Sequence, residues 1–376
     1  MKIIEVIDGG ILTTVQDLGR YGYQRYGVPV SGGLDRFALR AANIMVGNRE
    51  TEAGLETTLA SLRLRFIEDT VIAITGADIT PQMDGQAAPA WRPFAVPGGA
   101  VLSFDGVIEG MRAYVAVAGG IDVPQVLGSR STYTRSSLGG LEGRALISGD
   151  ILHTPGDGPV ERVEGKQLPS EQVPAHGHSH TLRVVMGPQD DAFAQEGIRT
   201  FLSSTYEVSP QSDRIGYRLQ GPAIQHTDGA DIVSDGIPLG AVQVTGDGMP
   251  VVLLADRGTT GGYAKIATVI TTDIPRLAQA APGDTITFQQ VSVEDAHVAL
   301  REQEEVIQRL KNVPPTVFSR RRYQAVVNGT THQVLGSLRE VTSQPQAESG
   351  KHTIRTTTNG ETRSFQVDIK GPGGGQ

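Results

Sequence analysis

The chain has 376 residues, of which 38% are hydrophobic and 20% are charged, and its formal net charge is −8. A chain of this length is expected to form two or three domains whose cores need no disulfide or metal. The acidic balance argues against sequence-independent nucleic-acid binding, which depends on Lys and Arg neutralising phosphates. Because cysteine is absent, disulfides, thiolate zinc sites and a cysteine nucleophile are excluded.

The N-terminal residues MKIIEVIDGG have acidic and glycine residues where a signal peptide needs an apolar core. No stretch approaches the ~20 consecutive apolar residues that span a bilayer. We therefore expect a soluble cytoplasmic protein.

Short β-rich runs separated by Gly, Asp and Pro dominate the first third of the chain and predict a barrel or a sandwich. These runs are Lys2–Ile7, Leu62–Phe66, Thr70–Thr75, Val101–Phe104 and Arg112–Ala118. A helix is predicted from about Leu34 to Val46, because apolar residues recur there at three- and four-residue steps.

The stretch Thr154–His180 is rich in Pro, Gly, Glu and His, which predicts a linker or long loop. A charged amphipathic helix is predicted over Glu294–Leu310, ended by Pro314 and Pro315. In the tail, Asn328-Gly329 and Asn359-Gly360 are typical of two-residue hairpin turns.

These patterns predict a mainly β chain with few helices. We divide it into a first β domain with a Gly-rich insertion (1–155), a linker (156–180), a second β domain (181–292), a helix (293–313) and a β-hairpin tail of unassigned role (314–376).

The two halves also share residues at a constant shift of 178 positions, the difference between Ser209 and Ser31. The matches are Ser31 with Ser209, Asp35 with Asp213, Arg36 with Arg214, Arg40 with Arg218, and Ala77-Asp78 with Ala255-Asp256. Chance matches are common for such residues, but the conserved order and spacing favour a duplicated β domain. Clefts at domain junctions commonly hold ligands.

Several catalytic and cofactor motifs are absent. The sequence has no Walker A loop, no G-x-S-x-G elbow and no H-E-x-x-H metal motif. It also lacks a Met-Lys-Met biotin acceptor, so we expect no covalent biotin. Because the metal motif is absent, we expect no metal site either.

Several longer stretches resemble the signatures of one family, known as allophanate hydrolase subunit 2, the 5-oxoprolinase C subunit or biotin-dependent carboxyltransferase (Kip type). The resemblance covers roughly residues 2–290. The matching stretches are Thr13–Gly22, Gly27–Pro29 with Ser31–Asp35, Ala118–Ile121 with Gly128–Tyr133, Ser212–Leu219 and Asp256–Lys265.

The resemblance implies two cyclophilin-like β-barrel domains from an internal duplication. It further implies a heteromeric complex with a partner subunit of related fold and a lactam-binding subunit. That complex would open 5-oxoproline to glutamate with ATP, bound on this chain or at a site shared with a partner. In family members fused into urea carboxylase, this region transfers a carboxyl group from carboxybiotin to urea.

Both reactions activate a planar amide, which requires hydrogen-bond donors for a developing oxyanion and a carboxylate to orient the N–H. The expected catalytic residues are Asp256, Arg257, Tyr263 and Lys265. The expected substrate-binding residues are Thr259, Thr260, Gly261, Gly262, Asp213, Arg214, Tyr217, Arg218, Gln16, Arg20, Arg130 and Ser131. The alternative is structural: an Asp256–Arg257 ion pair, with Lys265 as a solvated strand residue.

Two other functions stay open. One is a carboxyltransferase subunit of a biotin-dependent, urea-type amide carboxylase. The other is a non-enzymatic regulator that binds a kinase-inhibitor partner. Because the chain has no complete apparatus for ATP-driven lactam opening, we expect it to be inactive without its partner subunits.

Overall fold

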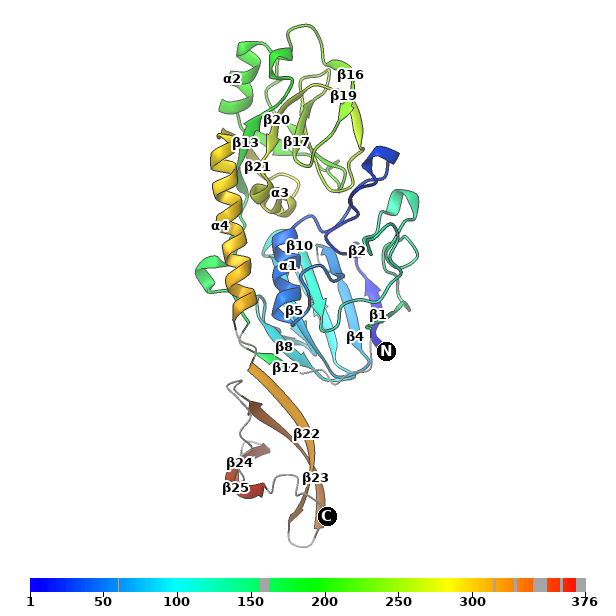
Figure 1. Ribbon diagram of the computed structural model, residues 1–376, viewed down its shortest axis with the longest axis vertical. Coiled ribbons are helices and arrows are strands. Elements are labelled where there is room, and N and C mark those ends of the chain that lie inside the picture. Colours follow the sequence, from blue (N-terminus) through cyan, green and yellow to red (C-terminus); the bar gives the residue numbers. More distant parts are fainter. Residues whose placement is uncertain are drawn as a thin grey trace.

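The computed structural model describes residues 1–59, 61–155, 162–164, 166–313, 316–327, 330–340, 350–358 and 361–369. Two β units follow one another along the long axis of the molecule (Figure 1). We call residues 1–155 the first unit and residues 179–290 the second unit. Among the described residues, no helix combines the length and apolar character needed to cross a membrane.

Two sheets make up the first unit. One has the strand order β11-β1-β4-β9-β6-β7 and the other β2-β3-β10-β5-β8. The strands are β1 (Lys2–Gly9), β2 (Leu12–Gln16), β3 (Gly54–Thr58), β4 (Leu62–Phe66), β5 (Thr70–Asp78), β6 (Pro81–Met83), β7 (Gln86–Ala87), β8 (Pro93–Val96), β9 (Val101–Phe104), β10 (Glu109–Val117) and β11 (Ile151–His153). Alternate residues of β4 are buried and exposed, as expected for a strand with one face on the core.

Helix α1 (Arg36–Met45) covers the five-stranded sheet. It begins after Asp35, whose side chain accepts a hydrogen bond from the backbone N–H of Ala38 at 2.9 Å. Its apolar face joins Trp91 and Tyr114 in a core cluster. The helix predicted from periodicity is confirmed.

A closed barrel of seven strands forms the second unit, in the order β13-β20-β17-β18-β15-β14-β21. The strands are β13 (Ser179–Met186), β14 (Tyr206–Val208), β15 (Gly216–Gln220), β17 (Ala241–Val244), β18 (Pro250–Leu253), β20 (Lys265–Val269) and β21 (Thr285–Gln290). The parallel pairing of β13 with β21 closes it. Two strands, β16 (Asp231–Gly236) and β19 (Thr260–Tyr263), form a separate ribbon, which we call the β16–β19 ribbon.

Two short helices of the second unit were not predicted. Helix α2 (Gln195–Ser203) has nine residues and no side-chain cap at Ala194. Helix α3 (Ile274–Gln279) has six residues and follows the 3-10 turn η5 (Thr271–Asp273). Helices this short depend on tertiary packing, which leaves little periodic signal.

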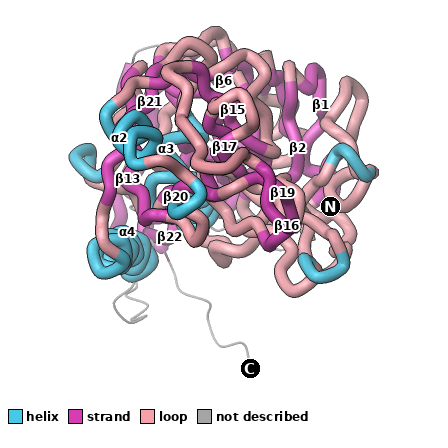
Figure 2. The backbone as a smooth tube through the Cα atoms, turned by 90° about the horizontal axis from the view of Figure 1, so that it is seen from above, coloured by secondary structure: helices cyan, strands magenta, loops and turns pink. Residues whose placement is uncertain are grey.

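Helix α4 (Val293–Asn312) runs beside both units, and Figure 2 views it end-on. It begins with a capping box between Ser292 and Asp295. Its Ile307 and Leu310 pack in the same cluster as α1. At its outer edge, Arg40 pairs with Glu304 at 2.8 Å. The predicted helix is confirmed, and it connects the two units.

The prediction of a mainly β fold with few helices is confirmed, but the 178-residue register is wrong for Asp35 and Asp213. Asp35 is buried and caps α1, whereas Asp213 is exposed in the loop between β14 and β15. Asp78 and Asp256 also differ, since Asp78 is the exposed last residue of β5 whereas Asp256 is buried in the turn that follows β18.

The tail forms the two predicted hairpins. Strand β22 (Thr316–Val327) pairs with β23 (Thr330–Glu340), and β24 (Gly350–Thr358) pairs with β25 (Glu361–Ile369). The turn residues 328–329 and 359–360 lie outside the described residues, as do 156–161 and 165 of the predicted linker. That linker also contains a strand, β12 (Arg162–Glu164), and a 3-10 turn, η3 (Ser170–Gln172).

Candidate functional site

A buried ionic network joins the two units, and Arg214 is at its centre. The Arg214 side chain donates from Nε to Asp256 Oδ2 at 2.9 Å and from Nη2 to Asp256 Oδ1 at 3.3 Å. It also donates to Glu56 of β3 and, at 2.7 Å, to the carbonyl of Gly32. We call Glu56, Arg214 and Asp256 the junction network. Burial alone would raise the pKa of Glu56, but the charges of Arg214 and Arg112 hold that pKa below its ordinary value.

Further buried hydrogen bonds cross the same junction. Tyr217 of β15 accepts from Arg112 Nη1 at 2.5 Å and donates to the carbonyl of Ala280 at 3.2 Å. Gln279 of α3 donates to Asp35 at 3.0 Å. Burial raises the pKa of Asp35. Tyr217 and Arg214, both predicted to bind substrate, are therefore engaged with protein groups at the boundary between the units.

Arg20 lies in a second buried polar cluster of the first unit. Its side chain is 1% exposed, and its Nη2 donates to the carbonyl of Ser131. Its Nε and Nη1 have no protein acceptor among the described residues. Burial lowers the pKa of Arg20, although the nearby carboxylates of Asp17 and Asp256 act in the opposite sense. A buried cation with unpaired donors is costly unless water or a ligand satisfies it.

The backbone around this cluster is strained. Ser31 is fully buried, has a left-handed φ of 56° and leaves its hydroxyl without a partner in the described part of the chain. Its N–H donates to the carbonyl of Ala255 at 3.0 Å, next to Asp256. Gly19 has a φ of 95°, and a Cβ there would lie 2.8 Å from the carbonyl oxygens of Ser31 and Val30. Gly19 is therefore needed for the close approach of these two loops.

A cleft of about 310 Å³ opens between the two units. The first unit contributes Gln24, Pro29 and Val30, and the second contributes Gly236, Ile237, Pro238, Arg257, Gly258 and Thr259. We call this space the junction cleft. Its size lies at the lower end of the range of small-molecule sites. Of the residues predicted from sequence, Arg257 and Thr259 line it.

Arg257 provides the positive charge of the junction cleft. Its Nε donates to the carbonyl of Ile237 at 2.9 Å and its Nη1 to the carbonyl of Leu254 at 3.0 Å. These bonds fix the guanidinium and leave Nη2 without a protein acceptor among the described residues. Burial, together with the charge of Arg36, lowers the pKa of Arg257 to about 10. The side chain is therefore still a cation at neutral pH.

The structural alternative of a solvated Lys265 is wrong. Its side chain is 1% exposed, and its Nζ donates to Asp235 Oδ2 at 2.9 Å. The hydrogen bond from Lys265 holds the pKa of Asp235 below its ordinary value. Asp235 belongs to the β16–β19 ribbon, so Lys265 anchors the ribbon that carries Gly236 into the cleft lining.

The other predicted site residues are dispersed. Tyr263 and Thr260 are exposed on the ribbon, and a Cβ on Gly261 would meet Ile237 at 2.7 Å. Asp213 pairs at the surface with Arg135 at 3.3 Å. Of the remaining predicted residues, Gly262 is half-buried in β19 and Arg218 is exposed on β15. Gln16 donates from Nε2 to the carbonyl of Thr132, and the backbone N–H of Arg130 donates to Asp17.

The alternative of an Asp256–Arg257 ion pair is also wrong, because the ion-pair partner of Asp256 is Arg214. Glu56 was not predicted from the sequence as a site residue. It lies in β3 (Gly54–Thr58), all of whose residues are buried, and its only signal in the sequence is a carboxylate within an otherwise uncharged strand. A buried carboxylate requires a cation or several donors.

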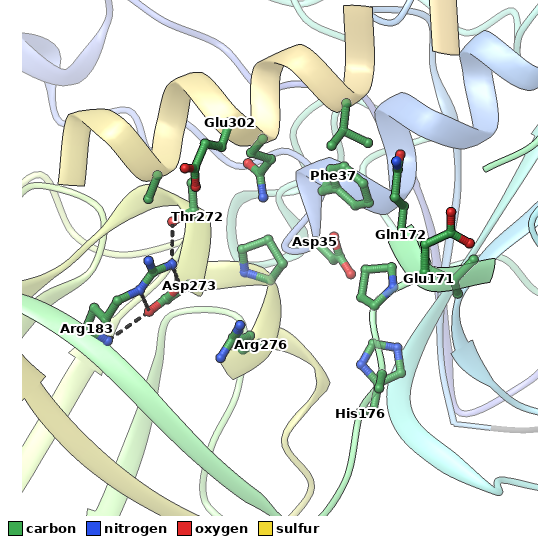
Figure 3. Close-up of a pocket in the computed structure, with 17 residues that line it drawn as sticks. Asp35, Phe37, Glu171, Gln172, His176, Arg183, Thr272, Asp273, Arg276 and Glu302 are labelled. Atoms are coloured by element: carbon green, nitrogen blue, oxygen red, sulfur yellow. Dashed lines mark hydrogen bonds and ion pairs between the residues drawn. The ribbon is translucent and has the colours of Figure 1, made fainter. Parts of the chain in front are cut away.

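A second cavity, of about 370 Å³, lies among α1, α3, α4 and residues 171–176 (Figure 3). There Arg183 forms an ion pair with Asp273 at 2.6 Å. None of the site residues predicted from the sequence lines this cavity. The residues brought together at the junction cleft therefore define the better candidate site.

Two β units with buried charges at their boundary and a ligand-sized cleft between them define a two-subdomain β protein. The model of the carboxyltransferase domain, subdomains A and B, matches residues 26–290, and the chain belongs to this family. The matched region contains the junction network and the cleft lining apart from Gln24.

The similar proteins have two kinds of name, 5-oxoprolinase C subunit and urea amidolyase or urea carboxylase. The 5-oxoprolinase C subunit of Escherichia coli is 38% identical over 310 residues, which cover 82% of this chain and 97% of that protein. Urea amidolyase of Saccharomyces cerevisiae is 36% identical over 322 residues, covering 81% of this chain and 17% of that protein. The crystal structure of Kluyveromyces lactis urea carboxylase has a TM-score of 0.78 and 33% identity, covering 82% of this chain and 29% of that one.

Proposed function

We propose that this chain is the C subunit of an ATP-dependent 5-oxoprolinase, which opens 5-oxoproline to glutamate in a complex with partner subunits. The main support is the 38% identity to the E. coli 5-oxoprolinase C subunit over 97% of that protein. In contrast, the urea amidolyase match covers only 17% of its protein. The size of the junction cleft, about 310 Å³, suits a small lactam.

The junction cleft offers donors for the oxygen of a bound amide. Thr259 lines the cleft, and neither its hydroxyl nor its backbone N–H has an acceptor among the described residues. Preorganised donors of this kind stabilise the negative charge that develops on the amide oxygen during ring opening. Arg257 adds positive charge to the same wall. Thr259 and Arg257 are therefore the proposed substrate contacts.

Asp256 has a positioning role in this proposal. Arg214 donates to both of its carboxylate oxygens, and Asp256 does not line the junction cleft. Through Arg214 and Glu56, however, it ties the loop before Arg257 to the first unit. The junction network thereby fixes the position of one wall of the cleft relative to the other.

ATP and the remaining chemistry are assigned to partner subunits or to a site shared with them. The sequence has no glycine-rich phosphate loop, and the junction cleft is small for a nucleotide. ATP, when bound, would activate the lactam carbonyl by transferring its terminal phosphoryl group to the amide oxygen, with release of ADP. The residues of this chain bind and orient the lactam, and the partner completes the site.

The test is reconstitution. The chain is purified alone and also co-expressed with a partner of related fold and a lactam-binding subunit. ATP-dependent glutamate formation from 5-oxoproline is then measured. We expect activity from the complex and none from the single chain. Hydrolysis by the single chain, free of partner by mass spectrometry, would refute the dependence on partners, and an inactive complex would refute the function.

A second candidate is a carboxyltransferase subunit acting on urea. It is favoured by the likeness to K. lactis urea carboxylase, with a TM-score of 0.78. Since the sequence has no Met-Lys-Met acceptor, the carboxybiotin would come from another chain. Biotin-dependent carboxylation of urea by the chain with a biotin carboxylase and carrier, and no glutamate formation from 5-oxoproline, would select this candidate.

A further inference from the structure

The second cavity, of about 370 Å³, is separate from the junction cleft, because the two share no lining residue. Helix α1 of the first unit contributes Phe37 to its lining, α3 of the second unit contributes Arg276, and α4 contributes Glu302 (Figure 3). Residues 171–176 line the opposite side. We call this space the α4 cavity. A ligand bound in it would contact both units and the helix that connects them.

Two opposite charges line the α4 cavity without a protein partner. Neither Arg276 nor Glu302 forms a hydrogen bond or an ion pair among the described residues, with each other or with any other side chain. Both side chains are exposed, so a small molecule can reach them. In Figure 3 both lie on the side of the cavity that α3 and α4 form. A cation and an anion that line one space and stay unpaired suit a ligand that carries both charges.

The neighbouring ion pair leaves these two charges available. Arg183 also lines the cavity, but it donates from Nε and Nη2 to the fully buried Asp273 at 2.9 and 2.6 Å. The charges of Arg183 and Asp273 are therefore compensated within the protein. Arg276 is the lining cation that has no carboxylate partner in the described part of the chain.

The rest of the lining sets the kind of side chain that the ligand carries. Asp35 and Glu171 add two carboxylates, which would repel a second acidic group on the ligand. The half-buried amide of Gln303 has no partner among the described residues and can bond to the ligand. The other lining residues are mainly apolar and include Phe37, Val173, Pro174, Pro275, Ala299 and Val306. An uncharged, apolar side chain is therefore favoured.

We infer that the α4 cavity binds a free α-amino acid with an apolar side chain. Arg276 binds its carboxylate, Glu302 binds its ammonium group, and its side chain packs against Phe37 and Val306. The volume of about 370 Å³ lies within the range of small-molecule sites. The inference goes beyond the proposed reaction and does not depend on it, since it concerns a different cavity and needs no partner subunit.

The test uses the purified full-length chain and L-leucine as the probe. Calorimetry measures affinity, and thermal unfolding measures the rise in Tm that a ligand of the folded state produces. Two further probes each lack one charge: 4-methylpentanoate has no ammonium group, and 3-methylbutylamine has no carboxylate. Each should bind at least roughly tenfold more weakly than leucine, the effect of losing a charged hydrogen bond. L-Glutamate should also bind more weakly, because of its second carboxylate.

Two substitutions assign the charges. Arg276→Gln and Glu302→Gln should each weaken leucine binding roughly tenfold or more. Neither should change the Tm of the ligand-free protein appreciably, because neither side chain has a protein partner. Arg276→Gln should leave 3-methylbutylamine binding unchanged, and Glu302→Gln should leave 4-methylpentanoate binding unchanged. The matched controls are Arg301→Gln and Glu294→Gln, which are exposed on α4 and do not line the cavity.

Three results would overturn the assignment. The first is no binding of leucine up to roughly 10 mM. The second is leucine binding that survives both substitutions, which would place the ligand elsewhere. The third is equal affinity for leucine and for either singly charged probe, which would show that the cavity does not recognise both charges. These measurements contain neither 5-oxoproline nor ATP, so a failure of the proposed reaction would leave them unaffected, and their failure would leave that reaction standing.

Discussion

Arg214 of the second unit donates from Nε to Asp256 Oδ2 at 2.9 Å, and the same guanidinium reaches Glu56 of the first unit. One cation thus holds two buried carboxylates from different β units. Attraction in such a buried group roughly offsets the cost of removing the charges from water, so its contribution to net stability is modest. Its contribution to the relative placement of the units is larger, because an unpaired carboxylate at the junction is strongly unfavourable.

The first prediction follows from this arrangement. Arg214→Met should lower the free energy of unfolding by about 3–5 kcal/mol, because it leaves Glu56 and Asp256 buried without their cation. Arg214→Lys should recover only part of the loss, since an ammonium cannot reproduce the two-pronged contact with Asp256. Urea denaturation measures both variants, with Arg218→Met as an exposed control. A loss below about 1 kcal/mol for Arg214→Met would show that the junction does not depend on this network.

The second prediction concerns Lys265, whose aliphatic stem is buried while its partner Asp235 is half exposed. Lys265→Ala should cost about 2 kcal/mol or more, because it leaves a cavity in the second unit. Lys265→Met should retain most of the stability, since its side chain fills that space and water can solvate Asp235. Thermal unfolding of both variants checks this. Equal destabilisation by Ala and Met would mean that the ion pair, and not the packing, dominates.

The fold was largely predictable where local signals sufficed. Periodicity predicted α1, and the apolar runs Leu62–Phe66 and Val101–Phe104 matched β4 and β9. The Asn-Gly pairs predicted both tail hairpins, because that dipeptide favours the positive φ angles of a two-residue turn.

The candidate site was less predictable, because its partners are distant in sequence. Glu56 and Arg214 are separated by 158 positions, and Lys265 and Asp235 by 30. No local pattern distinguishes a lysine that points into the protein from one in solvent. The repeat matched Asp35 with Asp213, yet only Asp35 caps a helix. Shared residue types were therefore a poor guide to shared environment.

The third prediction uses two glycines with the same backbone conformation. Gly19 has a φ of 95° and Gly22 a φ of 92°, but only a Cβ at Gly19 would collide with backbone atoms. Both Gly→Ala variants carry the penalty for left-handed backbone, about 1–2 kcal/mol. Gly19→Ala should be the more destabilised and should also weaken 5-oxoproline binding, because it separates the loops at Arg20 and Ser31. Denaturation and calorimetry test the pair, and equal behaviour of the two variants would contradict it.

The fourth prediction is a dependence of stability on acid. Burial lowers the pKa of His180, although Asp284, at 3.6 Å, opposes the effect. Below the ordinary histidine pKa of about 6.5, the unfolded chain binds a proton that the folded chain disfavours. The contribution of His180 is therefore complete above that pH and is lost as the pH falls. Urea denaturation from about pH 8 to 5 should show a shallower decline for His180→Gln than for the wild type, with His297→Gln as an exposed control. Parallel curves for all three proteins would contradict this.

The last prediction concerns Arg257 at alkaline pH. Burial and the charge of Arg36 lower the pKa of this side chain to about 10, whereas an ordinary arginine stays protonated above about pH 12. A group with a lowered pKa loses its cation as the pH rises through that value, so affinity for 5-oxoproline should fall from about pH 9 to 10.5. Calorimetry with the reconstituted complex follows this decline. Arg257→Gln should bind weakly throughout and show no alkaline decline of its own, and 2-pyrrolidinone should bind the wild type with little pH dependence, because it has no carboxylate to hold. Wild-type affinity for 5-oxoproline that stays constant to about pH 10.5 would show that the Arg257 cation does not contact the bound anion.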